Sequence, residues 1–229
     1  MRWGQFAAVL VVAVLGAVLS PPAAAYASPA LSAGMKIVIG NHSCSLGFFG
    51  GNANGDRLAV TSGHCADGVD QRVYAGNGTE IGIVVSHMPE SDARKSVRPR
   101  GYTLIQVYGR FKLNLSFAGI ADAHTGDRVW KRGARTGATS GTITDTYYTG
   151  GDRPSVETLI GNIVILPGDS GGPWYTDGPT LVGISASGHY DSGAGDDAGS
   201  QAQPVWSLIH LIRQNSPKWG PDFQVWTTS

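Results

Sequence analysis

Charge is in short supply in this sequence, and neither sign is in excess. Only 15% of the 229 residues are Asp, Glu, Lys or Arg, and 17 basic side chains balance 17 acidic ones. Nucleic-acid binding requires a surplus of Lys and Arg that neutralises phosphates, so we expect no nucleic-acid partner. Disordered chains combine high net charge with few apolar residues, whereas 41% of these residues are hydrophobic. The composition therefore predicts a globular protein with a substantial core.

Cysteine is equally scarce. Cys44 and Cys65 are the only two, and no further cysteine or close histidine stands beside them at the spacing of a metal site. We therefore expect neither a bound metal nor an organic cofactor. Glycine is abundant, with 33 residues, but it has no three-residue period, which excludes a collagen-like chain.

Long hydrophobic runs are limited to one, at residues 6–19. Arg2 precedes this run, and small residues follow it at positions 23–27. A basic start, a short apolar stretch and an A-x-A site are typical of a secretory signal peptide, cleaved here after Ala25 or Ala27. The run is about six residues shorter than a membrane span, which leaves an uncleaved anchor as the minor alternative.

Export of the chain sets further expectations. We assign residues 1–27 to the signal peptide, and we expect a secreted, extracellular protein with no membrane span after cleavage. In an oxidising compartment, Cys44 and Cys65 are expected to pair. The closed loop of about 22 residues would add roughly 3 kcal/mol to the stability if the chain-entropy account holds.

The remainder of the chain consists of short apolar segments separated by Gly, Asn, Asp and Pro. Such segments at fairly even spacing are typical of an all-β sandwich or a pair of barrels. Helical periodicity is convincing only near the end, in residues 205–212. We expect an N-terminal β unit at residues 28–118, and a C-terminal unit with the helix and tail at 119–229. The expected strands are residues 35–39, 44–49, 58–61, 72–75, 80–85, 103–108, 128–131, 142–148, 158–165, 172–175, 180–186 and 202–205.

The strongest chemical motif is the run Gly168-Asp169-Ser170-Gly171-Gly172-Pro173. A serine nucleophile needs an exposed hydroxyl on a tight turn with backbone N–H groups nearby, and flanking glycines permit such a turn. A passive serine in a glycine-rich turn is the structural alternative. The run also fits the nucleophile turn of α/β hydrolases, in which the acid and the base both follow the serine. Only 59 of the 229 residues follow Ser170, and the alternation of helices and strands that this fold requires is missing.

A second motif is Thr61-Ser62-Gly63-His64-Cys65, directly after the apolar segment 58–60. A histidine at a strand end, beside a cysteine that is expected to be tethered, is a positioned base. His64 also precedes Ser170, in the order base then nucleophile. A lone histidine is more often structural, and we interpret the other five in that way: His42, His87, His124, His189 and His210.

With these motifs the sequence resembles the chymotrypsin-like (trypsin-fold) serine proteases, and it is more similar to their short bacterial branch, which includes the streptogrisins and alpha-lytic protease. The resemblance covers roughly residues 35–215 and implies an all-β fold of two six-stranded antiparallel barrels with a C-terminal helix and the active site in the cleft between them. The segments that carry it are residues 44–48, 62–65, 136–137, 140–142, 168–173 and 203–205.

The resemblance also implies a role for each matching residue. His64 is the general base, Ser170 is the nucleophile, and the N–H groups of Gly168 and Ser170 form the oxyanion hole. Asp169 is expected to fold inward and brace this loop, paired with Lys131 or Arg132. A Cys44–Cys65 bridge matches the family's bridge beside the histidine.

The triad acid departs from the family's pattern. Gly101 stands where the resemblance places the aspartate. Asp92, 28 residues after His64, is the nearest upstream alternative and is our candidate acid. The structural interpretation, in which Asp92 is a solvated loop residue beside Glu90, has at least equal weight.

A second departure lies on the same hydrogen-bond network. Ala186 stands where relatives carry the serine that bonds the aspartate, although Ser185 or Ser187 could serve if the register slips by one residue. Loss of the acid in a known triad costs about four orders of magnitude in rate and still leaves catalysis above that of water. The departures therefore lower the expected rate without deciding the function.

Two functions remain. The first is a secreted, monomeric serine endopeptidase that cleaves peptide or protein substrates through an acyl-enzyme on Ser170, with His64 as the base. The alternative is a catalytically weak or inactive relative that acts as a binding protein, as Gly101 indicates.

The bridge that braces the specificity pocket in relatives is also missing, because Val164 occupies one cysteine position and residues 192–200 lack the other. A loose pocket for a small or apolar side chain is expected.

Overall fold

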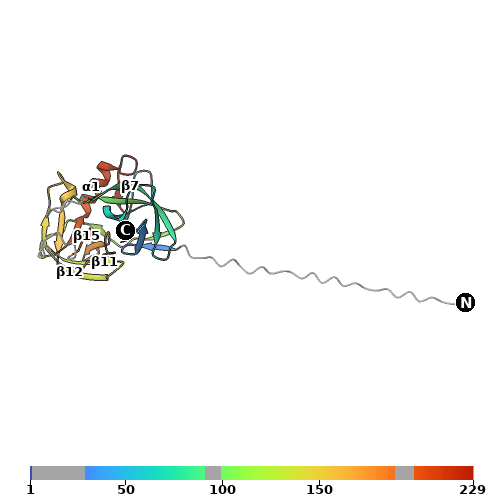
Figure 1. Cartoon of the computed structure of the whole chain (residues 1–229), viewed down its shortest axis with the longest axis horizontal. Helices are drawn as coiled ribbons and strands as arrows, with labels where there is room; N and C mark the ends of the chain where they lie inside the picture. The colour runs from blue at the N-terminus through green and yellow to red at the C-terminus, as the bar shows by residue number, and fades with distance from the viewer. Residues whose placement is uncertain (2–28, 91–98, 189–198, 229) are drawn as a thin grey trace.

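The computed structural model describes Met1 and residues 29–90, 99–188 and 199–228. Its strands form two β units that lie side by side, the first blue to green and the second yellow to orange in Figure 1. The helix α1 (Val205–Asn215) follows the second unit. Apart from Met1, the expected signal peptide lies outside the described residues, and so do Asp92 and His189.

The N-terminal unit is a curled sheet of eight strands in the order β17-β4-β5-β8-β7-β6-β2-β3. Its last strand comes from the chain's C-terminal tail, which adds β17 beside β4. A separate parallel pair joins β1 (Ala30–Ser32) to β9 (Lys112–Asn114). The eight strands are β2 (Lys36–Ile39), β3 (His42–Ser45), β4 (Phe48–Gly51), β5 (Leu58–Ser62), β6 (Arg72–Ala75), β7 (Glu80–Met88), β8 (Tyr102–Val107) and β17 (Gln224–Val225).

The C-terminal unit closes on itself. Its strands follow the order β10-β15-β14-β11-β12-β13-β16, and an additional pairing of β15 with β16 closes a six-stranded barrel. The strands are β10 (Gly119–Ile120), β11 (Arg128–Gly133), β12 (Gly137–Tyr147), β13 (Thr158–Gly161), β14 (Pro173–Thr176), β15 (Thr180–Ser187) and β16 (Ser200–Pro204). Two short 3₁₀ turns, η1 (Gly63–Cys65) and η2 (Pro154–Val156), complete the described elements.

This architecture confirms the expected fold class, which is all-β with a C-terminal helix. The N-terminal sheet curls as a half-barrel, whereas the C-terminal one is a closed barrel. One expected strand, residues 44–49, is two strands with a break at Leu46-Gly47. At this break the backbone of Gly47 passes close to β5, because a Cβ on Gly47 would lie 2.7 Å from the Val60 carbonyl oxygen.

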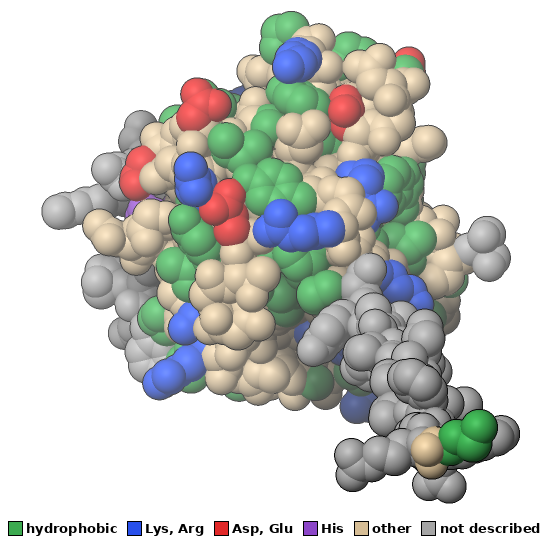
Figure 2. Space-filling view, turned by 90° about the vertical axis from the view of Figure 1, so that its right-hand side faces the viewer, with side chains coloured by type: hydrophobic (Ala, Val, Ile, Leu, Met, Phe, Trp, Pro, Cys, Tyr) green, Lys and Arg blue, Asp and Glu red, His purple; other side chains and the backbone are tan. Residues whose placement is uncertain are grey.

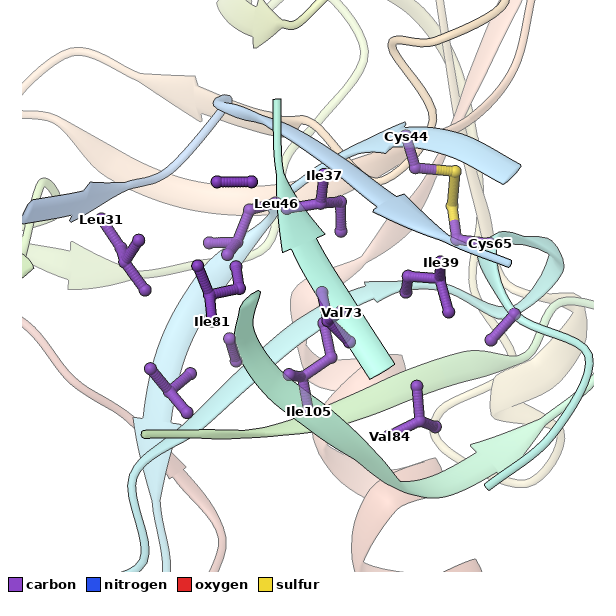
Figure 3. Close-up of a cluster of buried hydrophobic side chains, with 14 of the residues drawn as sticks. Leu31, Ile37, Ile39, Cys44, Leu46, Cys65, Val73, Ile81, Val84 and Ile105 are labelled. Carbon is purple, nitrogen blue, oxygen red and sulfur yellow. A yellow bond between two sulfur atoms is a disulfide. The ribbon is translucent and has the colours of Figure 1, made fainter. Parts of the chain in front are cut away.

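Buried apolar side chains form a core inside each unit and a third cluster between them. In the N-terminal core, the labelled side chains converge inside the curled sheet, and the Cys44–Cys65 disulfide lies at one side of the cluster (Figure 3). The cluster between the units joins Phe48 and Val60 of the first unit to Ile184 of the second and to Leu208 of α1. This shared core fixes how the units meet, and the fully buried side chains contribute about 1.5–3 kcal/mol each.

The surface carries both signs of charge. On the face shown in Figure 2, basic side chains are spread from top to bottom, whereas the acidic ones lie in the upper half, and apolar side chains stand between them. Among the described residues, no helix is both long and apolar enough to cross a membrane.

Candidate active site

His64 lies in η1, directly after β5 ends at Ser62. Hydrogen bonds on both sides hold this turn. The Ser62 hydroxyl donates to the Ser185 carbonyl of the other unit at 2.8 Å, and the Thr103 hydroxyl donates to the Ser62 carbonyl at 2.9 Å. His87 Nε2 donates to the Gly63 carbonyl at 2.8 Å. The imidazole of His64 is partly exposed, with 38% of its side-chain surface accessible, so it can meet a substrate.

The loop of Ser170 depends on glycine at two positions. Gly168 and Gly171 have φ angles of +106° and +81°, in the region that favours glycine. A Cβ on Gly171 would also lie 2.0 Å from Thr61 Oγ1. Ser170 itself is partly exposed at the tip of the turn.

Asp169 folds into the protein under this loop and is fully buried. Its carboxylate pairs with Lys131 Nζ at 3.1 Å and accepts N–H groups from Leu166 at 3.0 Å, Arg135 at 2.9 Å and Thr136 at 3.0 Å. Burial alone would raise the pKa of Asp169, but these donors and the lysine hold it below its usual value. Of the two cations considered from the sequence, Lys131 is therefore the one that pairs with Asp169.

The histidine turn and the serine loop lie against each other. Cys65 Sγ is 4.0 Å from the Ser170 carbonyl oxygen, which in turn accepts the Ser45 N–H at 2.8 Å. The residue after His64 therefore touches the residue that carries the candidate nucleophile. Within the described residues, neither the N–H of Gly168 nor that of Ser170 donates a hydrogen bond, so both can receive an oxyanion.

The carboxylate beside His64 is Glu90, which the sequence interpretation treated only as a neighbour of Asp92. Glu90 Oε1 lies 3.0 Å from His64 Nδ1, and its side chain is 13% exposed. The contact has ion-pair distance without the alignment of a hydrogen bond. Burial opposes the charge, but the contacts with His64 and Arg100 outweigh it and hold the pKa of Glu90 below its usual value.

The two departures from the family's pattern have structural counterparts. Gly101 precedes β8 and contributes no side chain to the histidine. In β15, the pairing with β16 shifts register between Ser185 and Ser187, on either side of Ala186. Ser185 Oγ accepts the indole N–H of Trp174 at 3.0 Å, and Ser187 Oγ accepts from Arg100 Nη2 at 2.9 Å. Neither serine is bonded to Glu90 in the described structure.

Among the residues that the structure describes, one cluster has the residue types of a metal site. Ligand atoms of Cys44, His64 and Cys65 all lie within 4.8 Å of one another. The sequence interpretation saw no histidine at ligand spacing, although His64 is adjacent to Cys65. Both sulfurs are consumed by the disulfide, however, and a disulfide cannot supply the thiolates that bind zinc. The oxidised pair therefore does not form a metal site.

Comparison with known proteins gives the family. No protein-family model matches the chain. A curated relative, Serine protease 2 of Streptomyces fradiae, is 30% identical over 161 residues, which cover 65% of this chain and 88% of that protein. The chain belongs to the bacterial chymotrypsin-like serine proteases. Membership of this serine protease family supports proteolysis in general.

Solved structures agree with the chymotrypsin-like fold of this serine protease family member. Thermobifida fusca Protease A superposes with a TM-score of 0.64 at 23% identity, covering 87% of this chain and 100% of that one. Nocardiopsis protease superposes with a TM-score of 0.61 at 22% identity, covering 86% and 100%. At this identity the likeness concerns the fold, and the chemistry must be argued from the residues themselves.

Proposed function

We propose that this protein is a secreted serine endopeptidase in which Ser170 is the nucleophile and His64 the general base. The observation that carries the proposal is the meeting of three features at the junction of the two β units. These are a partly exposed histidine with a carboxylate on Nδ1, a serine on a glycine turn beside it, and two free N–H groups in that turn. This combination serves acyl transfer.

The proposed reaction has two halves. Ser170 Oγ attacks the carbonyl carbon of the scissile peptide while His64 Nε2 takes its proton, and the N–H groups of Gly168 and Ser170 stabilise the oxyanion. His64 then gives the proton to the leaving amine, and the C–N bond breaks to leave an ester on Ser170. In the second half, His64 takes a proton from water, which attacks the ester carbon, and Ser170 leaves with its proton restored.

The proposed substrate is a peptide or protein chain with a small or apolar side chain next to the scissile bond. Val164, at the position of the missing pocket cysteine, is 52% exposed, so its apolar side chain stays at the surface. Most of the stretch that would hold the other cysteine lies outside the described residues. The proposed site of action is extracellular, with residues 1–27 removed on export.

Labelling of the serine tests the proposal. Mature wild-type protein should react with an organophosphorus reagent at one site, Ser170, located by peptide mass spectrometry, and should hydrolyse a chromogenic peptide. Ser170→Ala should abolish both, whereas Ser43→Ala, an exposed serine on β3, should change neither. Wild-type protein that is folded but neither labelled nor active would support the binding-protein alternative instead.

A further inference from the structure

We propose that Glu90 is the carboxylate that orients His64, and that it comes from the segment directly after β7, which faces Gly101, because a side chain at that glycine is sterically excluded. This inference rests on the proposed function and adds to it a positioning residue. It also accounts for both departures from the family's pattern, at Gly101 and at Ala186.

Space around Gly101 rules out an acid at that position. A Cβ on Gly101 would lie 1.8 Å from the Met88 carbonyl oxygen and 2.7 Å from that of Pro89. Both atoms are backbone, so they cannot turn aside as a flexible side chain would. Any aspartate at Gly101 would have to push the end of β7 away.

The pairing of β7 with β8 brings a carboxylate to the same place from the other side. The last paired residues are Met88 and Tyr102. Glu90 follows Met88 by two residues and Arg100 precedes Tyr102 by two, and their side chains meet with Glu90 Oε2 3.3 Å from Arg100 Nη1. Glu90 thus lies two residues beyond the end of the β7–β8 ladder, which sets its position beside His64.

Arg100 fixes the orientation of this carboxylate, and contacts with the second β unit hold Arg100 in place. Its side chain is 2% exposed. Nη2 donates to Ser187 Oγ at 2.9 Å and to the amide oxygen of Gln201, and its backbone N–H donates to the Ser155 carbonyl. The guanidinium is held by β15 and β16, and the Arg100 backbone by η2. Arg100 therefore takes over the support that a serine at Ala186 would give.

The two oxygens of Glu90 have separate partners. Oε2 contacts Arg100, while Oε1 is buried and has His64 Nδ1 at 3.0 Å without a hydrogen-bond partner in the described structure. Arg–carboxylate pairs frequently place both oxygens on the guanidinium, whereas only Oε2 of Glu90 contacts Arg100. The free oxygen is directed to the histidine, where it can hold Nδ1–H and leave Nε2 as the base. Hydrogen bonds of this kind often tighten when the substrate is bound.

The test compares charge-changing variants in the full mature chain with a peptide substrate. Glu90→Gln keeps the size of the side chain and should lower kcat by about 10²- to 10⁴-fold with KM within about threefold of the wild-type value. Glu90→Asp restores a carboxylate and should recover at least about tenfold of the loss. Asp92→Asn should stay within about twofold of the wild-type kcat. A structural role alone would not produce this split between kcat and KM or the recovery by aspartate.

A folding failure is handled by a second variant. Glu90→Gln leaves the buried Arg100 without a counter-charge, which can destabilise the protein. The double variant Glu90→Gln with Arg100→Gln removes both charges and should fold, as judged by circular dichroism, with the same loss in kcat as the single variant.

The outcomes separate this inference from the proposed function. If the wild type is active and labelled at Ser170, and either glutamine variant folds with wild-type kcat, the role of Glu90 is overturned while the proposed function stands. A loss with Asp92→Asn as large as that with Glu90→Gln also overturns it. If the folded wild type is neither active nor labelled, both proposals fall.

Discussion

At the scale of single residues, this active site depends on where side chains are missing. The Met88 carbonyl points between two glycines, and a Cβ on Gly63 would lie 2.6 Å from it, while one on Gly101 would lie 1.8 Å from it. These glycines let the end of β7 approach both η1 and the start of β8. That approach is what brings Glu90, two residues beyond Met88, to His64. The composition shows only that glycine is abundant. In the structure, Gly63 and Gly101 are required for the geometry of the site.

A single methyl group tests this close approach. Gly101→Ala should lower the free energy of unfolding by about 2 kcal/mol or more, because strand backbone must move to admit the Cβ. Gly109→Ala is the matched control, since nothing lies within 4 Å of its added Cβ. It should change the stability by less than about 1 kcal/mol. Urea unfolding of both variants gives the comparison, and equal midpoints would contradict the packing described here.

At the scale of elements, the disulfide holds the edge strand of the N-terminal sheet, whereas hydrogen bonds between strands close the C-terminal barrel. The C-terminal barrel is closed by the pairing of β15 with β16, whereas β3 is the outermost strand of an open sheet. Cys44 lies on β3, and Cys65 lies in η1, directly after β5. The bond therefore ties the free edge strand to the turn that carries His64.

Removal of this bond should cost both stability and activity. The two cysteines are 21 residues apart, and the loss of such a cross-link lowers the free energy of unfolding by roughly 3 kcal/mol. We expect this loss for Cys44→Ala with Cys65→Ala in urea unfolding. The kcat of the folded double variant should also fall, because η1 loses its covalent bond to β3 and keeps only its hydrogen bonds. An unchanged unfolding midpoint would show that packing alone holds β3 in place.

At the scale of the whole molecule, the sequence predicts local features well and long-range register poorly. The fold class could be predicted because short apolar segments and turn residues alternate along the chain. His64 and Ser170 could be selected because each sits in a contiguous motif. Glu90 could not be selected from the sequence, because the pairing of β7 with β8 brings it to its partners, and the segment between these strands hides which residues pair. The apolar residues in 80–88 and after 102 predict two strands, but they do not give the register between them.

Three carboxylates set the response of the protein to acid, and of these Glu157 and Asp169 are buried and Glu90 is largely buried. Burial would raise the pKa of each, but hydrogen bonds and cations hold the pKa values of Glu90, Glu157 and Asp169 below their usual values. Glu157 accepts N–H and O–H groups of the 149–151 loop and the hydroxyl of Ser207 on α1. Carboxylates whose pKa is lower in the folded state stabilise it above their unfolded pKa, and this contribution is lost as the pH falls through the folded pKa.

The free energy of unfolding should therefore change little from pH 7 to about 5 and should fall steeply below about pH 4, where the unfolded chain binds protons that the folded chain does not. Urea unfolding at pH 7, 5, 4 and 3 measures this free energy, and its slope against pH gives the number of protons taken up on unfolding. Glu157→Gln is the control, because an amide oxygen can still accept the loop donors but cannot titrate, so its slope should be smaller than that of the wild type. If the free energy of unfolding were constant down to pH 3, or if the variant had the wild-type slope, these carboxylates would not be the groups that couple folding to pH. The ion pairs at Glu90 and Asp169 would then contribute little to holding the two loops of the active site in place.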